Sequence, residues 1–323
     1  MKKHPFTAKA DYRKYFQGFL FYNALFAFMC FVVLFTIPYH NKNLQLFALS
    51  DKLDLLRNSH SPRIIFVGGS NLAYGLDSKM IASQFNLPTV NMGLHAGLGL
   101  KFILDVITPY VEKNDIVVIV PEYSHFFGGR MYGDIELLFV LAHVYPEGIR
   151  YVDLAQGMSL LDKIPFFVFS DARLSLWNCL FFKNNGYGPE KDISSYDRRA
   201  FNRDGDLTGR LKGKLDFQPY KKYDGGLNPD IITLMDRFHR KMQDRGVKVY
   251  FLFQAVQKAT YEAQSDNIDL ARENMKHLKL KALNTPEECV FGDNFFFDSP
   301  YHLNDKGIEL RTRQIINALR TVL

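Results

Sequence analysis

Short apolar runs alternate with segments of helical periodicity along most of the chain after residue 62. Three of these runs are continuously apolar and cover residues 63–69, 88–92 and 115–120. Such runs are typical of strands that are buried on both faces of a parallel sheet. Apolar residues three and four apart at 78–85 and 99–113 predict helices between them. The pattern therefore predicts an α/β fold, a three-layer sandwich around a central parallel sheet.

The alternation is interrupted between about residues 128 and 226 and then resumes. Within this stretch we expect a helix over residues 137–144, followed by a segment rich in Gly, Lys, Arg and Asp over 184–223. We interpret the stretch as an insertion that serves as a lid or as a partner-binding element. The remaining expected elements are a helix at 229–245, a strand at 247–254, a helix at 261–280, a strand near Val290 and a helix at 305–322. Residues 62–323 are therefore expected to form one domain.

A longer apolar run covers residues 15–37 and contains no charged residue. A helix needs roughly 20 such residues to cross the hydrocarbon core of a membrane. Five basic residues and one acid precede the run, so the positive-inside rule places residues 1–14 in the cytoplasm and the domain outside. A buried core helix and a cleaved signal peptide are the alternatives, but the run is long for a signal peptide and residues 38–42 offer no small-x-small cleavage site. We expect a single-pass anchor in the cytoplasmic (inner) membrane, joined to the domain by a linker over 38–61.

The charge and cysteine content of the chain restrict the kinds of partner and the cross-links that we expect. The chain has 323 residues and a formal net charge of +6, with basic residues concentrated between 183 and 222. No nucleic-acid-binding module accompanies them, so we expect no nucleic acid partner. A solvated insertion explains these charges, and contact with anionic headgroups or a surface polymer is the functional alternative. Outside the apolar run, Cys179 and Cys289 form either one disulfide or two buried thiols.

The first apolar run ends in Gly68-Gly69-Ser70. Parallel sheets place their ligands at the carboxyl ends of strands, and two glycines let the backbone turn sharply there. The N–H groups at the start of the following helix can stabilise an oxyanion. Ser70 is therefore a candidate nucleophile, and the alternative is that it only caps the helix.

A second candidate segment, from Asp298 to Asn304, lies about 230 residues later. His302 precedes the last expected helix and can reach over the end of the sheet as a base, while Asp298 can orient its imidazole. The alternative is a surface loop whose Asp305 caps that helix. Together the two segments supply a serine, an acid and a histidine, which is typical of serine enzymes that handle acyl groups.

Further candidates follow the other expected strands. Gly93 lies in the turn after the second strand, where a backbone N–H can approach Ser70, although a flexible turn also explains it. Glu122 and His125 follow the third strand and, with Asn71, are candidates for lining the site. We expect neither a metal nor another cofactor, because no familiar zinc spacing joins the histidines of this region, which are His60, His95 and His125.

The ordered segments resemble those of the SGNH (GDSL-like) hydrolase superfamily. The resemblance rests on Gly68-Gly69-Ser70, the turn at Gly93 and the tail with Asp298 and His302, and it covers about residues 63–313 apart from the insertion. It implies a flavodoxin-like fold with Ser70 as nucleophile, His302 as base and Asp298 as its partner. It also implies an oxyanion hole made by the backbone N–H groups of Ser70 and Gly93.

Two positions depart from the family pattern. The acid of the family usually lies three residues before the histidine, where this chain has Ser299, whereas Asp298 lies four before it. The third block usually offers an Asn donor, where this chain has Pro121-Glu122-Tyr123. Loss of one oxyanion donor typically costs on the order of 10²–10³ in rate, and a carboxylate opposes an oxyanion further. Glu122 therefore points away or pairs with a cation, or else hydrolysis is slow and the enzyme uses a supplied acyl donor.

The anchor, the Pro-Glu-Tyr block and the tail Tyr301–Asn304 resemble more narrowly the proteins that partner membrane-bound O-acyltransferases in lipoteichoic-acid D-alanylation and alginate O-acetylation. This resemblance implies transfer of an acyl group, most simply acetyl, to or from a cell-surface polysaccharide through an acyl-serine. The implied partners are the membrane, a multi-spanning O-acyltransferase and the polymer. A plain carbohydrate or lipid esterase and a non-catalytic scaffold for a membrane acyltransferase are the alternatives.

Overall fold

The computed structural model describes residues 8–36, 42–181, 196–208, 216–224 and 226–323. It divides into two compact units. The first contains residues 1–41 and 162–188, and the second contains residues 42–161 and 189–323. Residues 162–188, which fall inside the expected insertion, thus belong with the N-terminal segment and not with the domain that surrounds them in sequence.

A five-stranded parallel sheet forms the centre of the second unit, in the order β2-β1-β3-β4-β6. This sheet confirms the expected α/β class and its parallel strands. β1 and β3 are buried along their whole length, which explains why both runs are continuously apolar. The strands are β1 (Ile64–Gly68), β2 (Thr89–Asn91), β3 (Ile116–Val120), β4 (Lys248–Phe251) and β6 (Lys281–Ala282).

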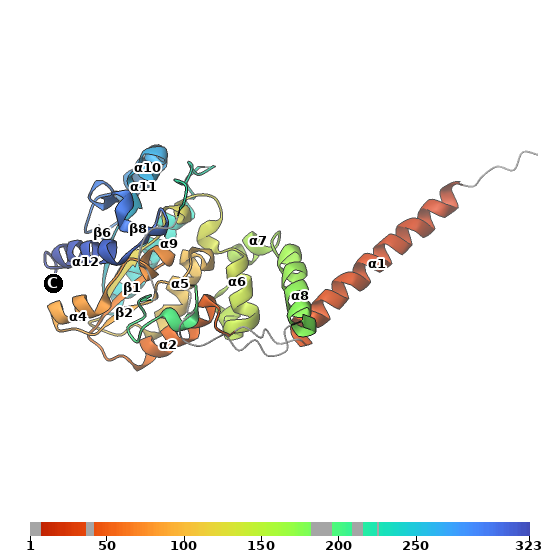
Figure 1. Ribbon diagram of the computed structural model, residues 1–323, viewed down its shortest axis with the longest axis horizontal. Coiled ribbons are helices and arrows are strands. Elements are labelled where there is room, and N and C mark those ends of the chain that lie inside the picture. The colour runs from red at the N-terminus through yellow and green to blue at the C-terminus, as the bar shows by residue number, and fades with distance from the viewer. Residues whose placement is uncertain (1–7, 37–41, 182–195, 209–215, 225) are drawn as a thin grey trace, which may run out of the picture. The chain divides into compact units, whose positions relative to one another are not determined.

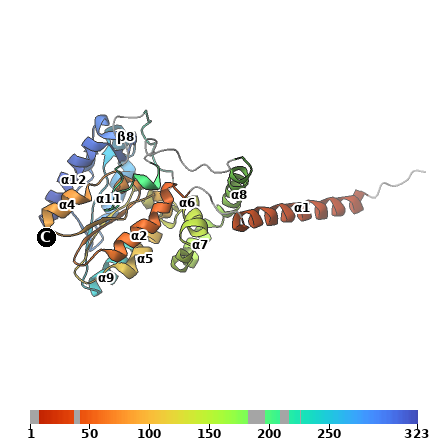
Figure 2. The same cartoon turned by 60° about the horizontal axis from the view of Figure 1, so that its bottom comes forward.

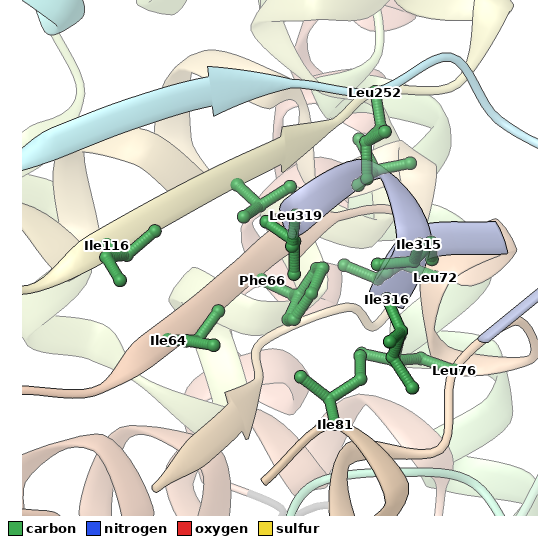
Figure 3. Close-up of a cluster of buried hydrophobic side chains, with 12 residues drawn as sticks. Ile64, Phe66, Leu72, Leu76, Ile81, Ile116, Leu252, Ile315, Ile316 and Leu319 are labelled. Carbon is green, nitrogen blue, oxygen red and sulfur yellow. The ribbon is translucent and has the colours of Figure 1, made fainter. Parts of the chain in front are cut away.

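A cluster of buried apolar side chains joins the sheet to the last helix (Figure 3). Phe66 of β1 lies at its centre, and Ile315 and Leu319 of α12 (Asp305–Leu319) pack against it together with Ile81 of α4 (Ser78–Phe85). α4 and α12 lie side by side in both ribbon views (Figures 1 and 2). The intervening residues of β1 and β3 are equally buried, and α5 (Leu100–Ile107) and α9 (Asp230–Asp244) pack on strands of the sheet.

Several elements differ from expectation. The helix expected over 261–280 is two shorter helices, α10 (Lys258–Ala263) and α11 (Ser265–Met275). The strand near Val290 is β7 (Val290–Phe291), which pairs with β5 (Val256–Gln257) in a separate small sheet. The other helices of this unit are α2 (Ala48–Asn58), α3 (Ser70–Ala73), α6 (Ile135–Phe139) and α7 (Leu154–Leu160). A π-helix, Val140–Val144, continues α6 and completes the helix expected over 137–144.

The first unit contains α1 (Ala8–Thr36) and α8 (Ile164–Phe181), which contact each other. Within α1, residues Tyr12–Val33 are long and apolar enough to cross a membrane. This finding agrees with an apolar N-terminal helix at the expected place, and the end of the expected anchor at residue 37 lies outside the described residues. Of the two alternatives for the cysteines, the structure agrees with a buried thiol at Cys289, which is free, whereas the side chain of Cys179 lies outside the described part.

Candidate active site

Ser70 is the first residue of α3, directly after the turn that ends β1. Gly68 and Gly69 are required in this turn by space. A Cβ at Gly68 would overlap the carbonyl oxygen of Val120, and one at Gly69 would overlap Oε1 of Glu122. As the first helical residue, Ser70 has a backbone N–H without an intrahelical acceptor. The hydroxyl therefore lies beside two backbone donors, those of Ser70 and Asn71, at the carboxyl end of the sheet.

Asp298 and His302 lie on an antiparallel hairpin, not in the loop that the sequence suggested. The hairpin is formed by β8 (Phe296–Ser299) and β9 (His302–Leu303). His302 Nδ1 lies 2.7 Å from Asp298 Oδ1, and His302 Nε2 lies 2.9 Å from Ser70 Oγ. The hairpin thus brings the three predicted residues into one continuous line of hydrogen bonds, with Asp298 in place despite its four-residue spacing.

Ser299, at the position where the family usually has its acid, contacts the backbone and not the imidazole. Its hydroxyl oxygen accepts the N–H groups of Tyr301 and His302 at 3.3 and 3.2 Å. These bonds hold the turn between β8 and β9 closed. Asp298 is therefore the carboxylate that reaches the ring of His302.

Two tyrosines, which the sequence did not single out, support the acid and the base. The Tyr74 ring stacks on the His302 imidazole at 4.0 Å between centroids and 7° between planes. The Tyr196 hydroxyl donates to Asp298 Oδ2 at 2.7 Å. Burial alone would raise the pKa of Asp298, but the hydrogen bonds from His302 and Tyr196 outweigh it and lower that pKa below its usual value. Asp298 therefore stays ionised at neutral pH and can stabilise an imidazolium.

The Glu122 carboxylate occupies the other side of Ser70. Glu122 Oε1 lies 3.0 Å from Ser70 Oγ and accepts the backbone N–H of Asn71 at 3.2 Å. The carboxylate also accepts the backbone N–H of His125 at the start of a 3₁₀ turn. Among the residues that the structure describes, Glu122 thus neither points away from Ser70 nor pairs with a basic side chain, the two arrangements considered above, but accepts hydrogen bonds at the candidate nucleophile.

The hydroxyl of Ser70 faces two acceptors. It has a single hydrogen, which can be donated either to His302 Nε2 or to Glu122 Oε1. His302 and Glu122 therefore compete for this one hydrogen.

His125 is fully buried and holds Glu122 in place. Its Nε2 lies 3.0 Å from the carbonyl oxygen of Ala96, and its Nδ1 accepts the backbone N–H of Glu122 at 3.2 Å. This pair of partners selects the neutral tautomer with the proton on Nε2. Burial lowers the pKa of His125, which keeps it neutral, although the nearby Glu122 opposes the shift. His125 is thus a positioning residue for Glu122.

Gly93 packs against α3, and its backbone N–H already has a hydrogen-bond acceptor. It donates to Asn91 Oδ1 at 2.8 Å, and a Cβ at this residue would lie 2.7 Å from the backbone nitrogen of Ala73. The tight packing against α3 explains why a glycine stands here. Its role as an oxyanion donor stays a prediction, and in this structure the donor beside Ser70 that holds an anion is the N–H of Asn71.

No group of three or more metal-ligating side chains occurs among the residues that the structure describes. His95 Nδ1 accepts the N–H of Gly97 at 3.1 Å, and His60 is exposed. His60 and His95 do not form a metal site with His125, because both ring nitrogens of His125 already have hydrogen-bond partners.

Comparison with models of protein families and with curated proteins gives no match to this chain.

Proposed function

We propose that the chain is a serine acyltransferase or esterase that works through an acyl-serine at Ser70. The observation that carries the proposal is the line Ser70–His302–Asp298, with 2.9 and 2.7 Å between its partners. Ser70 and His302 lie 232 positions apart in the sequence, and a helix cap alone would require neither the histidine nor the acid. We also propose that the α/β domain is a three-layer sandwich of the SGNH type.

The reaction follows from these positions. Ser70 Oγ attacks the carbonyl carbon of an ester while its proton passes to His302 Nε2, and Asp298 stabilises the imidazolium. The N–H groups of Ser70 and Asn71 hold the oxyanion. When the tetrahedral adduct collapses, the donor alcohol leaves with the proton from His302. An acceptor hydroxyl then gives its proton to His302 and attacks the acyl-serine, and Ser70 leaves protonated.

Glu122 has to leave its present place before this sequence can begin. Its Oε1 accepts the Asn71 N–H that the oxyanion needs, and a carboxylate there repels developing negative charge. A substrate that binds tightly enough to displace Glu122 is therefore processed, while water and small esters react slowly. This requirement favours transfer from a supplied acyl donor over free hydrolysis.

The proposed setting is the outer face of the cytoplasmic membrane, with α1 as the anchor and a surface polysaccharide as acceptor. The length and apolar composition of Tyr12–Val33 support the anchor, and the basic residues before it support a cytoplasmic N-terminus. A multi-spanning O-acyltransferase is the proposed source of acyl groups, from the resemblance stated above.

The test is covalent labelling of the full-length protein with a fluorophosphonate. The parent chain is expected to be labelled, whereas Ser70→Ala abolishes labelling and lowers acyl transfer by several powers of ten. Ser83→Ala is the matched control, because this serine is exposed on α4, away from the hairpin, and its hydroxyl donates to the carbonyl oxygen of Lys79 within the same helix. Labelling of Ser70→Ala at the parent level, or a parent chain that never reacts, would contradict the proposal and favour a non-catalytic scaffold.

A further inference from the structure

The first half of α8, which lies inside the insertion that we interpreted as a lid or a partner-binding element, exposes aromatic side chains. Phe166 is 62% exposed and Phe169 is 48% exposed. The Ser170 hydroxyl donates to the carbonyl oxygen of Phe166 at 2.8 Å, so this polar group is satisfied within its own helix. Ile164, the first residue of α8, is exposed as well. A patch of this kind is costly in water and marks an interaction surface.

The neighbour of α8 within its compact unit identifies what covers this surface. The ring of Phe169 contacts that of Phe26 in α1, with 5.9 Å between centroids. Phe26 belongs to the segment Tyr12–Val33 that is suited to cross a membrane, and this segment is only 6% buried. A helix that packs on a membrane span meets the same surroundings as the span, which are lipid chains.

We propose that the first half of α8 is embedded in the membrane surface beside α1, in the leaflet that contains the C-terminal end of α1. The occupant of the exposed aromatic face is therefore lipid. This inference depends on the membrane placement of α1, which is part of the proposed function, and is independent of the chemistry of Ser70.

The apolar part of α8 is too short to be a second span. Only Ile164–Ser170 separates Lys163 from Asp171, which corresponds to about 10 Å of helix, whereas crossing takes roughly 20 residues. The chain on both sides, up to Leu161 and from Pro189 onward, belongs to the same compact unit. It therefore has to return to the side from which it entered.

The depth of the contact with α1 agrees with shallow insertion. Phe26 precedes Val33, the last residue of the candidate span, by about 10 Å along the helix axis. Interfacial helices place their apolar faces roughly 5–10 Å into the boundary between headgroups and acyl chains. Phe169, opposite Phe26, thus lies at a depth that an interfacial helix reaches.

The residues that precede α8 suit the headgroup region. Leu154, Met158 and Leu161 are all exposed and lie four and three residues apart, so they share one face at α7. Lys163 follows them, and lysine is favoured at the polar edge of a membrane.

The test uses single-tryptophan reporters in the full-length chain. Trp177 is the one tryptophan of the sequence, so Trp177→Phe provides a tryptophan-free background. Reporters are then introduced singly by Phe169→Trp in α8, Phe21→Trp in α1 and Leu310→Trp on the exposed side of α12. Each protein is reconstituted in phosphatidylcholine–phosphatidylglycerol vesicles, and its emission is quenched either by acyl-chain-brominated lipid or by aqueous acrylamide.

The reporters at residues 169 and 21 are both expected to be quenched by brominated lipid and to be protected from acrylamide. The reporter at residue 310 is expected to be quenched by acrylamide and not by brominated lipid. Phe166→Trp repeats the measurement if the first variant does not fold. A residue-169 reporter that follows residue 310, or that neither quencher reaches, overturns the lipid contact while α1 stays inserted. Failure of bromine quenching at residue 21 instead refutes the membrane placement of α1 and the inference with it, leaving the reactivity of Ser70 to its own test.

Discussion

At the scale of single residues, the behaviour of the site depends on which acceptor receives the hydroxyl hydrogen of Ser70. His302 Nε2 and Glu122 Oε1 lie at 2.9 and 3.0 Å, so the two groups compete for it. Only donation to His302 leads toward attack on an ester. In the proposed reaction, Glu122 would therefore oppose catalysis twice, as a competing acceptor and as a negative charge beside the Asn71 N–H.

Replacement of this charge is expected to activate the site. In Glu122→Gln the amide keeps the size of the side chain, removes the negative charge and offers an N–H to an oxyanion. Because one oxyanion donor is worth on the order of 10²–10³ in rate, labelling by a fluorophosphonate and hydrolysis of an aryl acetate should rise about 10–100-fold. The measurement is the second-order rate constant at pH 7, with the exposed Glu112→Gln as control. A lower rate in Glu122→Gln would show that the carboxylate assists the reaction, and an unchanged rate would show that it does not oppose it.

Asp298 is expected to act through the orientation and charge of His302. Asp298→Asn should lower the rate of Ser70 acylation by about 10³–10⁴-fold, because an amide stabilises the wrong tautomer and no longer stabilises the imidazolium. Tyr196→Phe removes one donor from the same carboxylate, and a hydrogen bond to a charged group is worth about 1.5–3 kcal/mol, so its rate should fall by at most about 10–150-fold. The measurement is the rate constant of Ser70 acylation in the two variants, and a melting curve verifies that each variant is folded. Equal effects would mean that both residues serve only to hold the hairpin.

At the scale of elements, a buried lysine joins α2 to residues 196–208, the segment that begins with Tyr196. Lys52 Nζ donates to the carbonyl oxygens of Asn91 and Gly205 at 2.8 and 2.5 Å. Asp206 lies beside it and accepts from the backbone and side chain of Ser78 at 2.8 and 2.7 Å. Part of the expected insertion is therefore held at the end of β2, close to the site, by buried polar contacts and not by apolar packing alone.

This lysine makes stability dependent on pH. Burial lowers the pKa of Lys52 from 10.5 to about 7, although Asp206 and Asp51 oppose the shift. Between pH 7 and 10.5 the unfolded chain holds a proton on Lys52 that the folded chain has lost, so the free energy of unfolding rises with pH in this window. The full effect of the shift is on the order of 3–5 kcal/mol.

Lys52→Met is therefore expected to flatten the increase in melting temperature between pH 7 and 9, because methionine does not titrate. The exposed Lys79→Met serves as the matched control and should keep the parent slope. Melting curves followed by circular dichroism provide the measurement. Parallel pH profiles for the parent and Lys52→Met would contradict the shifted pKa.

The sheet was predictable because β1 and β3 are buried along both faces, which leaves a continuous apolar run in the sequence. The hairpin of Asp298 and His302 was not predictable, because its short strands pair over a few residues and leave no periodic pattern in the sequence. The contacts of Tyr74 and Tyr196 depend on tertiary packing and left no local pattern. Glu122 was recognised as unusual, but its place on Ser70 required the neighbouring backbone to be known.

At the scale of the whole molecule, the sequence suggested one anchor and one domain, and the structure instead divides the chain differently. Residues 162–188 leave the domain and join α1 in a separate unit. Asp171 and Arg173 interrupt the apolar run of α8, so no uninterrupted segment of membrane length marked it in the sequence. Only the pairing of α8 with α1 reveals that this part of the insertion is not a solvated loop.

The orientation of the whole chain decides which substrates Ser70 can meet. Positive charge before residue 15 and the absence of charge within residues 15–37 predict a cytoplasmic N-terminus and an external domain. In intact cells, a membrane-impermeant maleimide should therefore label Lys276→Cys, an exposed position of the domain, above the level of the parent chain. Lys3→Cys should react only after the membrane is permeabilised. The opposite result would place Ser70 in the cytoplasm and exclude a surface polysaccharide as acceptor, while an active Ser70 would still be compatible with acyl transfer to a cytoplasmic substrate.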